Sequence, residues 1–413
     1  MTASSLLYLI IGIFLLDFLF DQWLDWLNYK HAKTALPDRL KGIYDEAEYE
    51  KAQQYQKTRS RFSFFSSGVS AVIALLVLAL GGFGYLDSLL RPFFDNPIFL
   101  SLAFFGVLFV LSDLSNIPFQ WYSVFVIEEK FGFNKTTVKT FITDKLKGYL
   151  LTVIIGGGLG YVLLWLIQQL GTDFWLYALG VITAFSLFAN LFYTSLILPL
   201  FNKLTPLEEG ELKEKIETYA AGVKFPLDSI FVIDGSKRST KANAFFSGLG
   251  KKKKVVLYDT LIEKQSQEEL VAVLAHEVGH FKKKHIVLSL VLSVLQMSIT
   301  LFILSLLIFN VNLSVALGGE TLAVHLNLIA FGMLYTPISR VTGLLMNLLS
   351  RKNEFEADAY AATTYQAQPL QESLKKLSVT SLSNLTPHPW YVFINYSHPP
   401  LLQRLEALDQ YKA

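Results

Sequence analysis

The sequence has no cysteine, few charged residues and few histidines. The absence of cysteine from its 413 residues excludes a disulfide framework and a zinc site built on thiolates. Charged residues make up 17% of the chain, and their net charge of +2 says nothing useful about partners. Any metal site in this chain is therefore expected to use histidine or carboxylate side chains.

Long apolar runs dominate what is present. Hydrophobic residues make up 52% of the chain and aromatic residues 14%. Runs of about 20 apolar residues are long enough to cross a hydrocarbon core as helices. The first has no basic residues before it and no small-residue cleavage site after it, so we do not expect a cleaved signal peptide. The runs predict seven spans: Leu6–Leu27, Phe64–Tyr85, Ile98–Pro118, Leu150–Ile167, Phe174–Leu200, Ile286–Phe309 and Leu322–Leu349.

Connecting loops rich in lysine and arginine alternate along the chain with loops that have few or none. Basic residues are abundant after the first, third and fifth spans and at the start of the C-terminal tail. The second loop has only Arg91, and the fourth and sixth have none. Because cytoplasmic loops retain basic residues, we expect the N-terminus outside and the fifth loop and tail in the cytoplasm. Compact loops suggest a prokaryotic inner membrane, or the endoplasmic reticulum in a eukaryote. The Lys251–Lys254 run is expected near anionic lipid and not on nucleic acid.

The fifth loop ends with the pentad His276-Glu277-Val278-Gly279-His280. Histidines four apart lie on one face of a helix, so both imidazoles can reach one metal ion, and Glu277 can take a proton from the attacking water. Ser266 and Glu269 predict a capping box at the start of that helix. The pattern predicts a zinc metalloprotease, with two core histidines as the alternative.

A catalytic zinc needs a third protein ligand and an open position. Glu354 and Asp358 are four apart and share a helix face, whereas Glu356 points about 200° away from Glu354. One carboxylate can bind zinc while the other accepts a hydrogen bond from a ligand histidine. The alternative is a solvated acidic first turn of a helix. Four other histidines have no ligand-like spacing: His31, His285, His325 and His388.

Five segments of the chain carry a family resemblance: Glu128–Asn134, Ser236–Leu249, His276–His280, Asn353–Ala361 and Ser397–Leu405. Together they resemble the type I CAAX prenyl proteases, which are integral-membrane zinc metalloproteases. The resemblance implies Glu354 as third ligand, one zinc per chain, and Asp358 orienting a ligand histidine. It also implies that His398 and Arg404 lie near the zinc and that Asn243-Ala244 belongs to a substrate-binding edge strand.

The residues around Asn243 and His398 predict local structure independently of the resemblance. Ser229–Ile233, Lys241–Phe246 and Lys254–Tyr258 are β-rich runs, and Gly248–Gly250 predicts a hairpin between the last two. An unpaired edge could hold an extended peptide, although an ordinary packed hairpin is the alternative. His398 precedes two prolines, so we expect it to be extended and to cap the helix that contains Arg404.

The sequence therefore predicts a predominantly α membrane protein. We expect seven transmembrane helices and a cytoplasmic α+β zinc metalloprotease domain. The resemblance implies that the helices enclose a water-filled chamber and that the protease domain closes its cytoplasmic end. We expect a zinc endopeptidase acting on peptides or prenylated proteins at the lipid bilayer, with loss of the last three residues of CAAX chains implied by the resemblance. Two rivals remain, a membrane quality-control protease and a seven-span transporter with structural zinc. A site-2-type intramembrane protease would carry the pentad inside an apolar span, whereas here Glu268, Glu269 and Lys282–Lys284 flank it. The expected divisions are a bundle over 1–201, the pentad domain over 202–285, two spans over 286–349 and the rest of the protease domain over 350–413.

Overall fold

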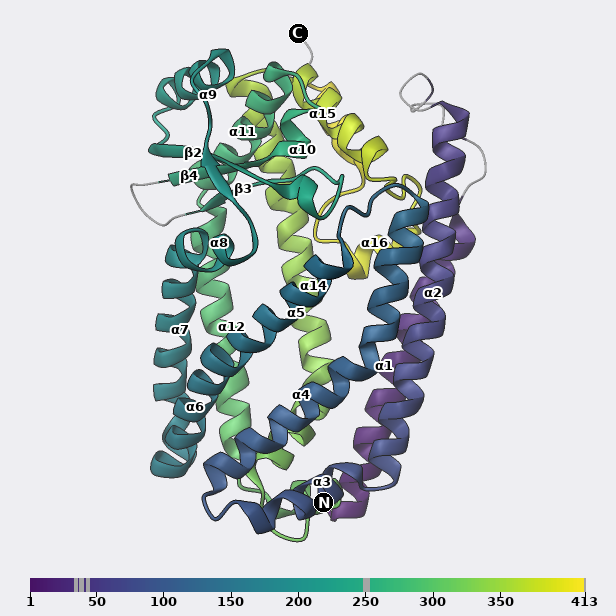
Figure 1. Cartoon of the computed structure of the whole chain (residues 1–413), viewed down its shortest axis with the longest axis vertical. Helices are drawn as coiled ribbons and strands as arrows, with labels where there is room; N and C mark the ends of the chain where they lie inside the picture. Colours follow the sequence, from purple (N-terminus) through teal and green to yellow (C-terminus); the bar gives the residue numbers. More distant parts are fainter. Residues whose placement is uncertain (33–35, 37–40, 42–44, 248–252, 412–413) are drawn as a thin grey trace.

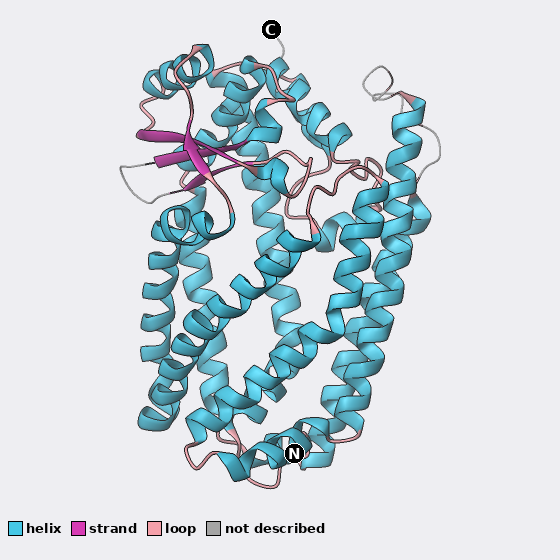
Figure 2. Ribbon diagram, viewed as in Figure 1, coloured by secondary structure: helices cyan, strands magenta, loops and turns pink. Residues whose placement is uncertain are grey.

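The computed structural model describes residues 1–32, 36, 41, 45–247 and 253–411. Long helices run along the long axis of the molecule, and most of the short helices gather with a small sheet at the end where the C-terminus lies (Figure 1). Helix accounts for most of the described chain (Figure 2). The predicted hairpin turn at Gly248–Gly250 and the first half of the Lys251–Lys254 run lie outside the described residues.

Within the described residues, six helical runs are long and apolar enough to cross a membrane. Only 6–22% of their most apolar windows is buried inside the protein, so these surfaces need an apolar solvent around them. This exposure is typical of a multi-pass membrane protein. The runs are α1 Ala3–His31, α2 Glu46–Ala79, α4 Pro97–Tyr122 with its π-helical extension Ser123–Glu128, the run Val138–Phe201, α12 His285–Leu307 and α14 Val324–Thr364.

The count is six and not seven because the predicted fourth and fifth spans form one run of 64 residues. That run reverses at the short 3-10 segment Gly171–Asp173, where Gly171 has a φ of +54° that favours glycine. After the reversal α7 lies against α6 (Figure 1). The parts are α5 Val138–Leu151, a π-helical turn at Thr152–Gly156, α6 Gly157–Leu170, α7 Phe174–Phe192, a second π-helical turn at Tyr193–Ile197 and α8 Leu198–Phe201.

The second span is also shorter than expected at its end. It was predicted to reach Tyr85, but α2 ends at Ala79, and Gly81 turns the chain with a φ of +66°. Close by, the backbone of Gly84 packs against that of Gly318. A Cβ at Gly84 would lie 2.0 Å from the Gly318 carbonyl, so no larger residue fits at this position. The connections at this end contain α3 Gly82–Leu90, the 3-10 turn Arg91–Phe93 and α13 Val311–Ala316.

Charged residues within the long helices pair across helices. Arg340 on α14 donates to the carboxylates of Asp17 and Asp21 on α1. Lys145 on α5 donates to Asp113 on α4, with 2.6 Å between Nζ and Oδ1. Such pairing reduces the cost of holding charge at membrane depth.

The sheet has four strands in the order β1-β2-β4-β3. β2 and β4 are parallel, while β1 pairs antiparallel with β2 and β3 pairs antiparallel with β4. The predicted hairpin between the last two strands is confirmed, with Ala244 opposite Leu257. β3 is an edge strand. The strands are β1 Leu204–Pro206, β2 Leu227–Ile233, β3 Ala244–Ser247 and β4 Lys253–Tyr258.

One hydrophobic core joins two distant parts of the chain beside this sheet. Buried Ile216, Val255 and Leu274 pack in the same cluster as Ala361 and Leu408. The segment before α12 and the segment after the apolar part of α14 therefore fold together. The helices of this part are α9 Glu211–Gly222, the 3-10 turn Gly235–Lys237, α10 Asp259–Ile262, α11 Gln267–Lys282, α15 Ala367–Thr380, α16 Pro389–Asn395 and α17 Leu401–Asp409.

Candidate metal centre

The pentad lies on α11, and the predicted capping box is present at the start of that helix. The Ser266 hydroxyl accepts from the Glu269 N–H, and the Glu269 carboxylate accepts from the Ser266 N–H. The cap fixes where the helix begins, and the four-residue spacing then puts His276 and His280 on one face. Their ring centroids are 4.9 Å apart. Glu277 follows His276 directly in the sequence and is half-buried.

Gly279 allows α11 to approach α14 closely. A Cβ at this position would lie 2.9 Å from the Cα of Ala357 and 3.1 Å from its carbonyl oxygen. Any larger residue would push the two helices apart. The one weak helix former in the pentad is thus explained by the contact that brings the histidines to Glu354 and Asp358.

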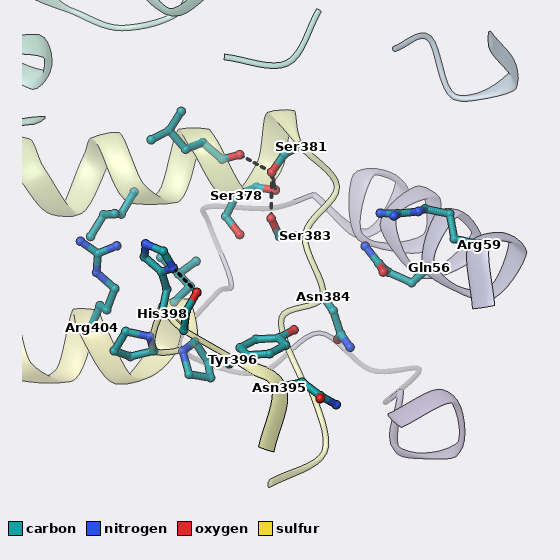
Figure 3. A pocket seen from close by; sticks show the side chains of 16 residues that line it. Gln56, Arg59, Ser378, Ser381, Ser383, Asn384, Asn395, Tyr396, His398 and Arg404 are labelled. Atoms are coloured by element: carbon teal, nitrogen blue, oxygen red, sulfur yellow. Dashed lines mark hydrogen bonds between the residues drawn. The ribbon is translucent and has the colours of Figure 1, made fainter. Parts of the chain in front are cut away.

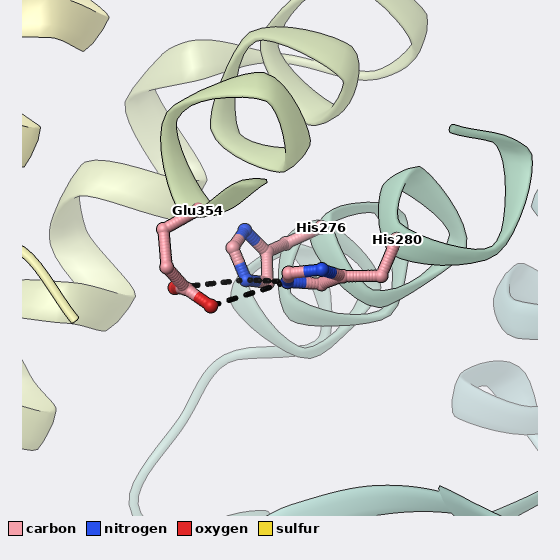
Figure 4. Close-up of side chains that lie close together, drawn as sticks. All are labelled: His276, His280 and Glu354. Atoms are coloured by element: carbon pink, nitrogen blue, oxygen red, sulfur yellow. Dashed lines mark hydrogen bonds and ion pairs between the residues drawn. The ribbon is translucent and has the colours of Figure 1, made fainter. Parts of the chain in front are cut away.

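Glu354 completes a three-residue group with the two histidines (Figure 4). The Nε2 atoms of His276 and His280 are 3.2 Å apart. His280 Nε2 lies 3.3 Å from Glu354 Oε1, and His276 Nε2 lies 3.5 Å from Oε2. Ligands about 2.0–2.1 Å from a tetrahedral zinc stand about 3.3 Å from one another. The observed separations therefore fit the edges of a zinc coordination shell.

The burial of Glu354 supports the same conclusion. The residue is 4% exposed, and Oε2 makes no hydrogen bond among the described residues. A buried carboxylate oxygen without a partner is costly unless a cation compensates it. Burial disfavours a proton on His280, but the hydrogen bond to Glu354 and the charge of Glu354 raise the pKa of His280 above its usual value. The negative charge that favours a proton here equally favours a metal cation.

Hydrogen bonds on the far side of each imidazole set its tautomer. His276 Nδ1 lies 2.8 Å from Asp358 Oδ1, and because a carboxylate only accepts, Nδ1 carries the hydrogen. On the other ring, His280 Nδ1 lies 3.1 Å from His285 Nδ1, while His285 Nε2 lies 3.1 Å from Glu356 Oε2. By the same reasoning His285 donates to Glu356 and accepts from His280. Both Nε2 atoms are left with free lone pairs that face Glu354.

His285 was expected outside the site, and the structure places it against His280. Lys284, with a φ of +60°, turns the chain between α11 and α12 so that the first residue of α12 folds back. A left-handed turn at a lysine has no clear sequence signal, so the spacing alone could not place His285 here. Glu356 was expected to point away from Glu354, and it does so by reaching His285.

Arg404 lies on the other side of Asp358. Its Nε and Nη2 donate to the two carboxylate oxygens at 2.8 and 2.6 Å, and Nη1 lies 3.5 Å from Glu354 Oε2. Burial opposes the charge on the guanidinium, but the hydrogen bonds and charge of Asp358 raise the pKa of Arg404 above its usual value. The bidentate pair holds Asp358 in place beside His276.

His398 also lies beside the group formed by His276, His280 and Glu354. Its Nε2 lies 3.4 Å from Glu354 Oε1, and the side chain is 64% exposed. Its expected role as a helix cap is wrong. The N-cap of α17 is Pro400, and His398 Nδ1 instead lies 2.9 Å from the Ser397 hydroxyl. Two prolines separate His398 from the helix, which leaves its imidazole free to reach Glu354.

Asn243 and Ala244 lie at the start of β3, and the strand is shorter than predicted. It begins at Ala244, and the Asn243 side chain accepts from the Ala244 N–H at 2.9 Å. The Asn243 carbonyl accepts from Tyr258 N–H in β4, at 3.1 Å. Because donors alternate along a strand, Ala244 and Phe246 direct their backbone groups toward the free edge.

The approach to β3 is fixed by the connector after α4. Thr240 N–H donates to the Phe133 carbonyl at 3.1 Å, and Lys135 N–H donates to the Arg238 carbonyl at 3.0 Å. The Lys241 ammonium lies 2.7 Å from Glu128 Oε2. Two of the five segments that carry the family resemblance, Glu128–Asn134 and Ser236–Leu249, thus meet in space.

Comparisons with known proteins agree along the whole chain. Residues 25–203 match a family model described as CAAX prenyl protease N-terminal, five membrane helices, and residues 206–412 match peptidase family M48. A CAAX prenyl protease 1 homolog of Oryza sativa subsp. japonica is 36% identical over 98% of both chains. CAAX prenyl protease 1 of Saccharomyces cerevisiae is 36% identical over 97% of this chain and 94% of its own. The crystal structure of S. mikatae Ste24p superposes with a TM-score of 0.93 at 35% identity, covering 98% of this chain and 99% of that one.

Proposed function

Because the chain belongs to peptidase family M48 and its CAAX prenyl protease branch, we propose that it cleaves prenylated, membrane-associated chains near their C-termini. The protein is an integral-membrane metalloendopeptidase. The observation that carries the proposal is the group His276, His280 and Glu354, whose mutual distances of 3.2–3.5 Å suit a tetrahedral zinc.

These three residues would hold one zinc ion per chain. When bound, zinc supplies Lewis-acid polarisation of a carbonyl and makes water acidic enough to lose a proton near neutral pH. Asp358 and the His285–Glu356 pair keep both ligand imidazoles in the tautomer whose Nε2 lone pair faces the metal position. Arg404 keeps Asp358 in place.

The protein's own groups move the protons. Glu277, half-buried on the same helix as the two histidines, takes a proton from the attacking water and returns it to the leaving amine. His398 donates a hydrogen bond to the oxyanion that develops on the scissile carbonyl, and its position 3.4 Å from Glu354 supports this role. The Arg404 guanidinium, which lies beside Glu354, adds positive charge near the same oxyanion.

The edge of β3 would hold the substrate as an added strand. The outward carbonyl of Ala244 and the outward N–H and carbonyl of Phe246 are suited to main-chain hydrogen bonds with an extended peptide, while the Asn243 side chain already holds the Ala244 N–H. This arrangement fixes the carbonyl that faces the metal position, because strand pairing allows only a discrete register.

We further propose seven crossings. A straight helix of 64 residues would be about 96 Å long, three times the thickness of a bilayer core, and the run Val138–Phe201 reverses at Gly171. Basic loops then lie on one side, with the protease domain in the cytoplasm and the N-terminus outside. The side chains of Arg340, Asp17 and Asp21 are 28–45% exposed, which supports a water-filled chamber between the helices. The protease domain combines 202–285 with 350–413, as the shared core supports.

Cleavage of one peptide, with and without a prenyl group, tests the proposed function. The purified full-length protein should release the C-terminal tripeptide from the prenylated form, detected by mass spectrometry, and Glu277→Gln protein should not. Equal cleavage of the unprenylated peptide would indicate a general membrane-protein peptidase. No cleavage of either form by zinc-loaded protein would contradict the proposal.

A further inference from the structure

A pocket of about 580 Å³ adjoins the metal centre on the side of α2. His398 and Arg404 form one wall, and Gln56 and Arg59 reach into it from α2 on the opposite side (Figure 3). Both His398 and Arg404 also contact Glu354. The pocket therefore adjoins the group that would hold the metal.

The lining of this pocket suits an anion. None of the described residues that line it is an aspartate or a glutamate, whereas Arg59, Asn395 and Ser383 bring hydrogen-bond donors. Arg404 is already bound to both oxygens of Asp358. Arg59 makes no ion pair among the described residues, and its guanidinium is held over the Tyr55 ring, 5.4 Å from the centroid. Arg59 is thus an oriented cation that lacks an acidic partner within the described chain.

The size of the pocket fits a short peptide. A roughly spherical pocket of this volume is about 10 Å across, and three extended residues span at most about 10–11 Å. A chain whose scissile bond lies at the metal centre could therefore place a terminal carboxylate at the far wall after three residues.

We infer that this pocket receives the C-terminal carboxylate of the substrate, and that Arg59 pairs with it. The inference rests on the proposed function, since it assumes cleavage three residues from the end of a chain. Arginine binds carboxylates through two parallel hydrogen bonds, a geometry that an amide terminus cannot reproduce. Arg59 then makes the enzyme selective for bonds close to a free C-terminus.

The test compares two prenylated peptides that differ only in a C-terminal carboxylate or amide. Wild-type protein should favour the free acid by about ten- to hundredfold in kcat/KM, as for a charged hydrogen bond. Arg59→Ala should remove this preference by lowering kcat/KM for the acid alone, and Arg59→Lys should restore part of it. Arg61→Ala is the matched control, because Arg61 lies on the same helix, bonds Tyr29 and does not line the pocket.

A binding measurement distinguishes failure of this inference from failure of the proposed function. Calorimetry with the full-length protein would compare valyl-isoleucyl-methionine as free acid and as amide, which requires no turnover. Tighter binding of the acid, lost in Arg59→Ala, would support the pocket even if no peptide is cleaved. Equal binding of acid and amide, or an equal loss on both peptides in Arg59→Ala, would overturn it.

Discussion

The imidazole of His285 lies against that of His280, with 3.1 Å between their Nδ1 atoms. Glu356 lies on the far side of His285, so the proposed zinc ligand His280 contacts one imidazole, which in turn contacts a carboxylate. Partners of this kind orient a ligand and raise its basicity. The contact joins the start of α12 to the end of α11, and it links the apolar part of the molecule to its metal centre.

We predict that His285→Ala weakens zinc binding by about 10–100-fold, because His280 loses the acceptor that fixes its tautomer. Glu356→Gln should have a smaller effect in the same direction. Competition with a chelator of known affinity would measure both. Affinity equal to wild type in His285→Ala would show that the contact is only packing.

The purified protein should contain close to one zinc per chain by elemental analysis. Glu354→Ala should lose that zinc, because only two ligands remain. Glu356→Ala is the matched control, since its carboxylate contacts His285 and not the metal position, and it should still fill with zinc at saturating metal. Equal loss from the two variants would contradict the assignment of Glu354.

Glu277→Gln should keep its zinc while turnover falls by a factor of about 100 or more. The amide preserves the shape of the side chain but cannot accept a proton. Steady-state cleavage of the prenylated peptide, together with metal analysis of the same preparation, would measure both quantities. A variant that cleaves at the wild-type rate would rule out Glu277 as the general base.

Ala244→Pro should lower kcat/KM by more than tenfold at unchanged zinc content, because proline removes the N–H that the Asn243 side chain holds at the start of β3 and restricts the backbone. Asn243→Ala should cost about 0.5–1.5 kcal/mol, or two- to tenfold, through one side-chain hydrogen bond. A bound peptide lying on another element, with β3 paired on both sides, would refute this mode of binding.

Single cysteines can test the orientation, since the chain has none of its own. Lys237 and Glu320 are exposed, and we expect Lys237→Cys to be labelled only from the cytoplasm and Glu320→Cys only from the other side. Glu320 is preferable to Gly319, where a Cβ would lie 2.6 Å from Leu326. Labelling of both cysteines from one face would contradict the seven-crossing topology.

Local sequence relationships determined much of this protein. Apolar runs of bilayer length, the capping box of Ser266 and Glu269, and the shared faces of His276 with His280 and of Glu354 with Asp358 depend only on helix period and chain distance. These could be predicted because their partners are at most four residues apart or lie in one continuous run. The assignment of Glu354 over Asp358 as ligand needed the family resemblance.

Relationships between distant segments were decided by the tertiary structure. Gly279 brings α11 against Ala357 on α14, and Lys284 folds His285 back onto His280. Arg59 faces His398 across a pocket although more than three hundred residues separate them in the chain. The period of a helix fixes which residues share a face, but it carries no information about which other face packs against it. That choice depends on shape and burial throughout the folded chain.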